Sequence, residues 1–132
     1  MSHKVTVNWD NGSQYEISND QGYKGIGRLT PGEDGLSPIE LLSSSLALCV
    51  SISLVKLMEK DSVDAGKISV AVEAFKAKSL PSRVERFEII VSLPGIIGPD
   101  YADKLIHEAE RVCTIGTTLK VGVRIETEAH SY

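Results

Sequence analysis

The chain has 132 residues, enough for one domain with a buried core. Its 14 basic and 18 acidic residues give a net charge of -4, without a basic cluster. Nucleic acids and anionic membrane surfaces are therefore not expected as partners. The N-terminal residues contain no apolar segment of the secretory type, so we expect a cytoplasmic protein with reduced cysteines.

The N-terminal region has the pattern of a small antiparallel sheet. Apolar and polar residues alternate over 5–9, which is the period of a half-buried strand. Asn11-Gly12 is a strong hairpin signal, and a return strand is predicted through 15–17. A third strand is predicted over 23–29. The next residues, 30–37, are rich in Gly, Pro and acidic side chains, which predicts a loop.

A long helix is predicted to follow this loop. Ser37 suits the N-cap, Pro38 suits the first helical position and Glu40 suits the first turn. The fifteen residues of 41–55 carry no charge, and apolar side chains cover all faces of the helix. Such a helix is buried on every side, and in a chain this small one wall is expected to be a second subunit. The uncharged stretch is shorter than the ~20 residues of a membrane span and contains five serines, so a span is not expected.

The C-terminal half predicts a hairpin, a helix and a last strand. Alternation over 67–78 and 83–93 is typical of two long paired strands. An amphipathic pattern predicts a helix from Pro99 into Cys113, with Gly116 as a candidate helix stop. Alternation returns over 119–126 and predicts a strand. The order strands, helix, strands, helix, strand indicates an α+β fold.

The two cysteines lie on the two predicted helices, and three interpretations were weighed. Cys49 and Cys113 could be small buried hydrophobes, because free cysteine is often fully buried. A zinc site is not expected, because the sequence has no C-x-x-C, no H-x-x-x-H and no histidine beside either cysteine. The histidines are expected at the surface: His3, His107 and His130. The third interpretation is redox chemistry between the two thiols.

Redox chemistry requires a thiolate, and the surrounding residues must stabilise it. A thiol with a pKa of ~8.5 is only about 3% ionised at pH 7, and burial lowers that fraction. A mostly ionised thiol needs a pKa shift of roughly 2 units, or about 3 kcal/mol. The helix has no charge between Glu40 and Lys56, so a cation from another segment is required. Arg28, in the region before the helix, is the nearest candidate.

Two motifs resemble a known family. The segment 35–42, with the sequence GLSPIELL, and the later Leu48-Cys49 resemble the central-helix motif of the OsmC/Ohr family. The segment 109–114, AERVCT, followed by an alternating stretch, resembles the second-cysteine motif of that family. The cysteine spacing and the element order agree as well. The resemblance therefore covers nearly the whole chain as a single OsmC-like domain, 1–132.

The resemblance implies a fold and a chemistry. The family forms an intertwined α+β homodimer, with antiparallel sheets around long buried central helices and active sites at the subunit interface. Its characterised enzymes are thiol-dependent peroxidases that prefer organic hydroperoxides and are restored by an external dithiol. The resemblance makes Cys49 the attacking cysteine, Cys113 the resolving cysteine and Arg28 the support of the thiolate. It implies no metal and no cofactor.

The chain departs from the family pattern at two positions. Catalytic members carry a glutamate directly after the helix-starting proline, where it orients the arginine; here that residue is Ile39 and the carboxylate follows at Glu40. One residue is a rotation of about 100° on a helix, so Glu40 is not expected to replace it directly. Glu40 is a secondary candidate, with a first-turn acid favoured by the helix dipole as the alternative. The family's usual proline after the second cysteine is Thr114.

Two other functions remain open. The first is an OsmC-like dimer that binds an apolar small molecule, with the cysteines as lining and without peroxidase activity. The missing glutamate at Ile39 favours this alternative. The second is a structural or interaction protein that retains the fold without the chemistry. A bond between Cys49 and Cys113 in oxidised protein would count against the last possibility.

Overall fold

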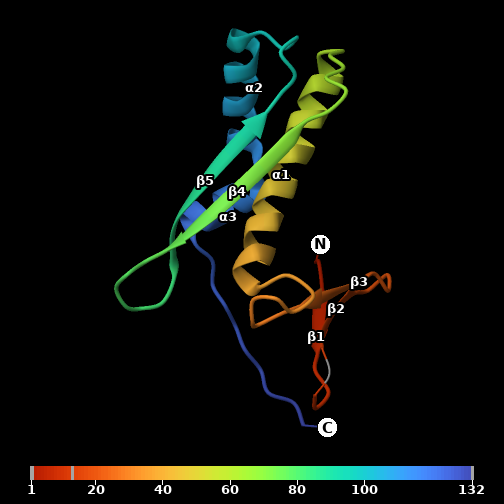
Figure 1. The fold of residues 1–132 in the computed structure, drawn as a ribbon, viewed down its shortest axis with the longest axis vertical. Helices are drawn as coiled ribbons and strands as arrows, with labels where there is room; N and C mark the ends of the chain where they lie inside the picture. Colours follow the sequence, from red (N-terminus) through yellow and green to blue (C-terminus); the bar gives the residue numbers. More distant parts are fainter. Residues whose placement is uncertain (1, 13, 132) are drawn as a thin grey trace. The chain divides into compact units, whose positions relative to one another are not determined.

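The computed structural model describes residues 2–12 and 14–131, and Figure 1 traces the chain. The chain forms two compact units. One contains the chain up to Ser44 together with Ala74–Phe87, and the other contains Ser45–Glu73 together with the chain from Glu88 onwards. The elements are, in order, β1 (Val5–Asn8), β2 (Tyr15–Asn19), β3 (Lys24–Gly27), α1 (Pro38–Lys60), β4 (Ser69–Lys76), β5 (Val84–Ser92), α2 (Pro99–Val112) and α3 (Thr114–Val121).

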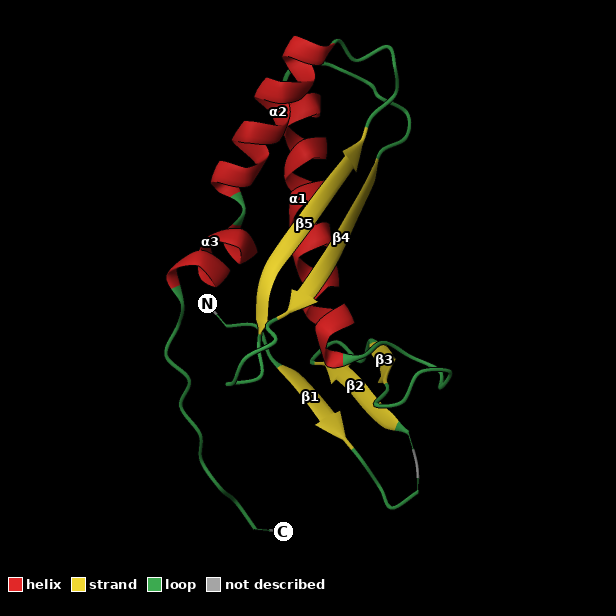
Figure 2. Cartoon of the chain, turned by 60° about the vertical axis from the view of Figure 1, so that its left-hand side comes forward, coloured by secondary structure: helices red, strands yellow, loops and turns green. Residues whose placement is uncertain are grey.

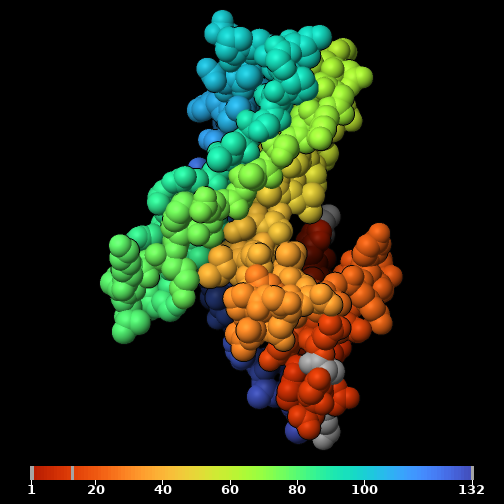
Figure 3. Space-filling model, in the orientation of Figure 1, coloured from red at the N-terminus to blue at the C-terminus, as the bar shows by residue number. Residues whose placement is uncertain are grey.

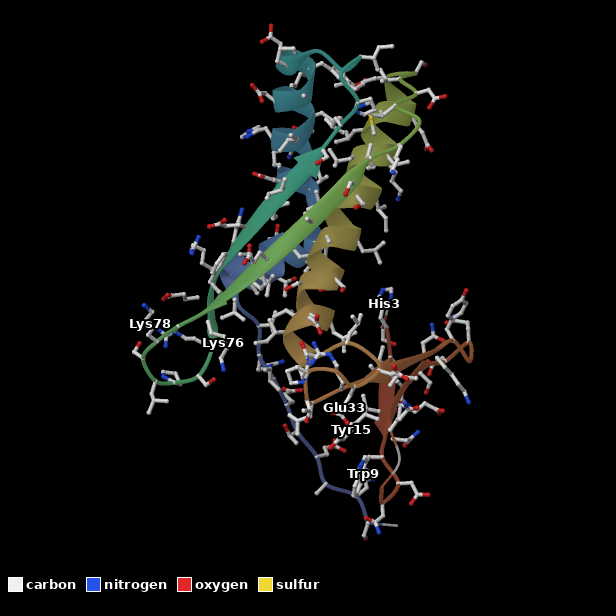
Figure 4. The ribbon with its side chains drawn as sticks, in the orientation of Figure 1. His3, Trp9, Tyr15, Glu33, Lys76 and Lys78 are labelled. Atoms are coloured by element: carbon white, nitrogen blue, oxygen red, sulfur yellow. The ribbon has the colours of Figure 1, made fainter. Side chains whose placement is uncertain are left out.

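The first unit begins with the antiparallel sheet that the sequence predicts. Its strand order is β1-β2-β3, and the register places Val7 opposite Ile17. Trp9 and Tyr15 stack at the hairpin end of the sheet, with ring centroids 6.3 Å apart, and both are labelled in Figure 4. This stacking of two aromatic side chains across the turn supports the register.

The loop after β3 folds back onto that strand. The Leu36 N–H donates to the Ile26 carbonyl at 3.0 Å, and the Arg28 N–H donates to the Leu36 carbonyl at 3.0 Å. Gly35 permits this return, because its φ is +107° and a Cβ there would lie 2.3 Å from the Ile26 carbonyl oxygen. The closed loop holds Arg28 near the start of α1.

The first turn of α1 is capped as predicted. Ser37 Oγ accepts a hydrogen bond from the Glu40 N–H at 3.1 Å, and Glu40 Oε1 accepts one from the Ser37 N–H at 2.9 Å. This reciprocal pair is a capping box, which satisfies two backbone donors that the helix leaves unpaired. Serines inside the helix bond back to it, as Ser51 Oγ does to the Ala47 carbonyl at 2.7 Å. These bonds satisfy the serine hydroxyls within an otherwise apolar segment of the helix.

The core of the second unit lies on one face of α1. That core comprises Leu46, Val50, Leu54 and Met58 of α1, with Leu105, Ala109 and Cys113. The opposite face of the same helix is open in a single chain, since Leu48, Ile52 and Val55 are 61%, 46% and 40% exposed. Figure 3 also shows part of the α1 surface, in yellow, uncovered. One chain therefore provides only part of the all-round burial that the sequence predicts.

Helix α1 is long and apolar enough to cross a membrane by length and composition alone. A single such helix is weak support for a span, because core helices of soluble proteins meet the same criterion. Here its residues from Leu46 to Met58 supply a packed core face. One face of α1 therefore packs as a core helix does, while 28% of its apolar window is buried within this chain.

The strands β4 and β5 form the predicted hairpin. They make a two-stranded sheet, whose turn is closed by a hydrogen bond of 2.9 Å from the Ala77 N–H to the Arg83 carbonyl. Near the turn, the Arg86 guanidinium lies over the Phe75 ring, 4.0 Å from its centroid. Figure 2 shows the two strands as one long ribbon pair.

The predicted strand over 119–126 is wrong. The chain forms helix α3 up to Val121 instead, and residues 122–131 have no regular secondary structure, as the green trace in Figure 2 shows. Gly116 lies inside this helix rather than stopping α2, and Gly122, with φ +84°, ends it. Alternation predicts a half-buried face, but a strand forms only where a partner strand takes up its hydrogen bonds.

Candidate active site

Cys113 occupies the break between two helices of the second unit. It ends α2 and is also the N-cap of α3, with extended backbone angles of φ -73° and ψ 110°. Its side chain is 1% exposed. The chain turns at this position, so that the Cys113 sulfur lies beside the N-terminus of α3.

The structure brings the two predicted cysteines together. The Cys113 thiol donates a hydrogen bond to the Cys49 sulfur, and both residues are free thiols. Cys49 lies midway along α1 and is half-buried, whereas Cys113 is fully buried. The fold therefore meets the condition that a resolving role of Cys113 requires, namely that residues 64 positions apart lie together.

The first backbone N–H groups of α3 surround the two sulfurs. The Thr114 N–H donates to Cys49, the Ile115 N–H contacts both sulfurs, and the Gly116 N–H donates to Cys113 Sγ at 3.3 Å. These groups have no partner within a helix, because a helix leaves its first four N–H groups unpaired. They therefore supply positive partial charge directly at the thiol pair.

These contacts make the two thiols unequal. Burial raises the pKa of Cys49, but hydrogen bonds from the Ile115 N–H, the Cys113 thiol and the Thr114 N–H outweigh it, so this pKa lies below its usual value. Burial raises the pKa of Cys113, and the hydrogen bond that it donates to Cys49 raises it further. Cys49 is therefore the thiol that ionises first.

A groove of about 420 Å³ opens beside Cys49. Its lining includes Cys49, Lys56 and Lys60 from α1, with Val112 and Thr114 from the α2–α3 junction. The lysines stand two and three turns further along the helix, roughly 10 Å and 16 Å from Cys49 in axial rise. A molecule in this groove would contact the Cys49 thiol at one end and positive charge at the other.

The other two predicted site residues pair with each other in the first unit. Arg28 Nη2 lies 2.8 Å from Glu40 Oε1, and the Arg28 side chain is only 18% exposed. Glu40 thus contacts the arginine, and whether it takes over the role of the family glutamate stays a prediction. The capping box aims the Glu40 carboxylate back toward Ser37, and the closed loop brings Arg28 to the same oxygen. The hydrogen bonds from Ser37 and then the Arg28 charge lower the pKa of Glu40.

The predicted residues thus form two pairs in different units. Cys49 and Cys113 belong to the second unit, and Arg28 and Glu40 to the first, so the contact of Arg28 with the thiolate stays a prediction. The histidines are exposed, as expected: His3, His107 and His130. Among residues 2–12 and 14–131, no cluster of His, Cys, Asp or Glu has the form of a metal site. The α3 N–H donors were not predicted from the sequence, because Gly116 was expected to stop a helix and the strand predicted over 119–126 overlaps the end of α3.

Comparisons with known proteins agree with this geometry. The family model of the OsmC-like protein matches residues 31–128, and a comparison with curated proteins gives no match. An OsmC-like protein from Mycoplasma pneumoniae has a similar fold, with a TM-score of 0.81 at 14% identity over 91% of this chain and 88% of that one. An organic hydroperoxide resistance protein from Elizabethkingia anophelis gives 0.74 at 18%, covering 91% and 89%. The OhrB protein of Bacillus subtilis gives 0.62 at 21%, covering 91% of each chain.

Proposed function

The chain belongs to the OsmC-like protein family, and on that premise we propose that it reduces organic hydroperoxides with its two thiols. The hydrogen-bonded pair of Cys49 and Cys113 carries this proposal. In this pair, a thiol of lowered pKa lies beside a second thiol at the same site. Solved structures of similar fold include proteins named for organic hydroperoxide resistance, which supports a role in hydroperoxide chemistry.

The two thiols act in successive steps of the proposed reaction. The Cys49 thiolate attacks the terminal peroxide oxygen and breaks the O–O bond, giving a sulfenic acid and an alkoxide that is protonated to the alcohol. The Cys113 thiol then attacks the sulfenic sulfur, which forms a disulfide and releases water. An external dithiol reduces this disulfide by exchange and becomes oxidised in turn.

Arg28 and Glu40 are proposed as support for the reaction. The ion pair keeps the guanidinium oriented and partly shielded from water, since the side chain is 18% exposed. A guanidinium held in this way suits a thiolate or the developing alkoxide. In a homodimer, the cation can come from either subunit. We propose such a homodimer, located in the cytoplasm, with the open face of α1 as part of the interface.

Peroxide consumption tests the proposed function. We expect reduced protein with excess dithiol to remove an alkyl hydroperoxide, and Cys49→Ser to remove none above the dithiol background. Cys113→Ser should allow at most one rapid turnover and then leave a sulfenic acid that a sulfenic-specific probe labels. Wild-type protein that is no faster than Cys49→Ser would contradict peroxidase activity.

An apolar pocket in the first unit favours the alternative of ligand binding. This pocket of about 340 Å³ has Arg28 as its charged lining residue. Apolar side chains of β1, β2, the loop and the first turn of α1 also line it: Val7, Tyr15, Ile17, Leu29, Leu36 and Leu41. Such a pocket suits an apolar small molecule with one acidic group. Saturable binding by a protein without peroxidase activity would favour this alternative.

A further inference from the structure

The α1 wall of the groove carries a second polar side chain close to Cys49. Ser53 lines the groove one turn after Cys49, and residues four apart on a helix have Cβ atoms about 5–6 Å apart on the same face. Because helical side chains lean toward the N-terminus, the Ser53 side chain lies over the turn that carries Cys49. It is rotated about 40° from Cys49, away from Leu48 and the open face of α1. Both residues belong to the second unit, so this placement does not depend on a second subunit.

The hydroxyl of Ser53 differs from that of its neighbour Ser51. Ser51 Oγ donates to the Ala47 carbonyl at 2.7 Å, so this hydroxyl is already bonded within the helix. The Ser53 hydroxyl makes no hydrogen bond to any residue that the structure describes. Ser53 is half-buried, and none of the described buried side-chain oxygens lacks a partner, so its Oγ is reachable from the groove that it lines. Ser53 therefore offers a hydrogen-bond donor to a molecule beside Cys49.

We infer that Ser53 is a catalytic residue, whose hydroxyl donates a hydrogen bond to the carbon-bound oxygen of the hydroperoxide while the O–O bond breaks. The thiolate electron pair of Cys49 forms the S–O bond to the terminal oxygen, and the electron pair of the O–O bond moves to the carbon-bound oxygen. The Ser53 hydroxyl stabilises the negative charge there, and solvent water then protonates the alkoxide to the alcohol. The inference rests on the proposed function, which makes Cys49 the attacking thiol, and it adds a donor to the support proposed for Arg28.

A hydroperoxide can reach both side chains at once. Its terminal oxygen can approach the Cys49 sulfur to about 3 Å, and its carbon-bound oxygen can accept from Ser53 at about 2.8 Å. Two contacts of this length, joined by one O–O bond, bridge side chains whose Cβ atoms lie about 5–6 Å apart. The lysines of the groove stand two and three turns from Cys49, so Ser53 is the nearer donor.

The rate of a single oxidation of Cys49 tests this inference without turnover. Reduced protein reacts with tert-butyl hydroperoxide in the absence of dithiol, and mass spectrometry follows loss of the thiol in tryptic peptide 29–56, which is separate from 112–120. We expect Ser53→Ala to lower the second-order rate constant at least about tenfold, because a hydrogen bond to a charged group is lost. Ser51→Ala makes the same change in the same helix and should stay within about twofold of wild type. Equal rate constants for the two variants would overturn the inference.

A change of leaving group separates a catalytic hydroxyl from a structural one. The leaving group of peracetic acid is acetate, a weak base that needs little stabilisation, so Ser53→Ala should lose less than about threefold with this oxidant. Ser53→Thr keeps the hydroxyl and should recover most of the rate with tert-butyl hydroperoxide. Alkylation of Cys49 by iodoacetamide at pH 7 should be as fast in Ser53→Ala as in wild type, because the thiolate is unchanged. An equal loss with both oxidants, or with iodoacetamide, would overturn the inference.

The same measurements distinguish the role of Ser53 from the proposed function. Wild-type protein that shows the dependence on Ser53 but no turnover with dithiol would refute the peroxidase activity and leave this role standing. Wild-type protein that turns over, while Ser53→Ala is oxidised as fast as Ser51→Ala, would refute the role of Ser53 alone.

Discussion

Among single residues, Cys49 and Cys113 suit different steps of the proposed reaction because their surroundings differ. Cys49 is half-buried at a groove and accepts hydrogen bonds, which suits an attacking thiolate. Cys113 is buried and donates a hydrogen bond to Cys49, which suits a thiol that reacts in the second step, with the sulfenic acid. A resolving thiol must remain protonated until the first step is complete, and the raised pKa of Cys113 has that effect.

Glu40 allows a prediction about pH. Its pKa is lowered in the folded chain, so its charge stabilises the fold above the unfolded pKa of about 4.3, and this contribution is lost as the pH falls through the folded value. Glu40→Gln keeps the capping hydrogen bond but removes the charge. We expect its Tm to be below that of wild type at pH 7, with the difference shrinking toward pH 3 in thermal scans. A difference that is independent of pH would contradict this account.

Ser37 provides the matched comparison for that experiment. Its hydroxyl accepts the Glu40 N–H whether or not the carboxylate is charged. Ser37→Ala removes this cap and also one of the hydrogen bonds that lower the pKa of Glu40, so it should cost about 1 kcal/mol of unfolding free energy at pH 7 and less at pH 3. A loss of equal size at both pH values would contradict the contribution of the Ser37 hydroxyl to the lowered pKa of Glu40.

Among the elements, the return loop to α1 depends on one glycine. A Cβ at Gly35 would lie 2.3 Å from the Ile26 carbonyl oxygen, and the φ of +107° is unfavourable for other residues. Gly35→Ala should lower the free energy of unfolding by at least about 2 kcal/mol in urea titrations. Gly12 is the control, since its φ is +85° and no atom lies within 4 Å of the added Cβ. Gly12→Ala should cost about 1 kcal/mol, and equal losses would rule out the clash.

The sequence predicts well those elements whose position is set by residues close together in the chain. The capping pattern of Ser37 and Glu40 starts α1 where predicted, and the Asn11-Gly12 turn joins β1 to β2. Helix α3 was missed because the alternation over 119–126 has the period of a strand, while the N-cap at Cys113 carries no distinctive sequence signal. The error concealed the donors at Cys49, since backbone N–H groups leave no trace in composition.

The site shows the same limit of sequence reasoning. The two cysteines were predicted from the resemblance and their helices, and their contact depends on the fold of the second unit. The pairing of Arg28 with Glu40 was not predicted, because the rotation argument considered the helix alone. The loop that returns to β3 moves the arginine to the carboxylate, so the relevant geometry is not contained in α1.

For the whole molecule, the open face of α1 is the surface that we propose as the dimer interface. Leu48, Ile52 and Val55 lie on one side of the helix, opposite the core face, and remain 40% to 61% exposed. Apolar side chains lined up in this way are typical of an interface rather than of a solvated surface. Cys49 lies on the flank between the two faces, at about 100° from Leu48 around the helix. A second copy on the open face would therefore border the active site.

The oligomeric state tests that arrangement. Light scattering after size exclusion should give twice the mass of one chain for wild type, and the mass of one chain for the double variant Leu48→Lys with Ile52→Lys, because two lysines cannot be buried at an apolar interface. The control is Gln21→Lys, which adds a positive charge in an exposed turn and should remain a dimer. If the subunit boundary completes the site, the double variant should also lose most of its kcat/KM for an alkyl hydroperoxide. A wild-type monomer with full activity would refute both the dimer and the shared site.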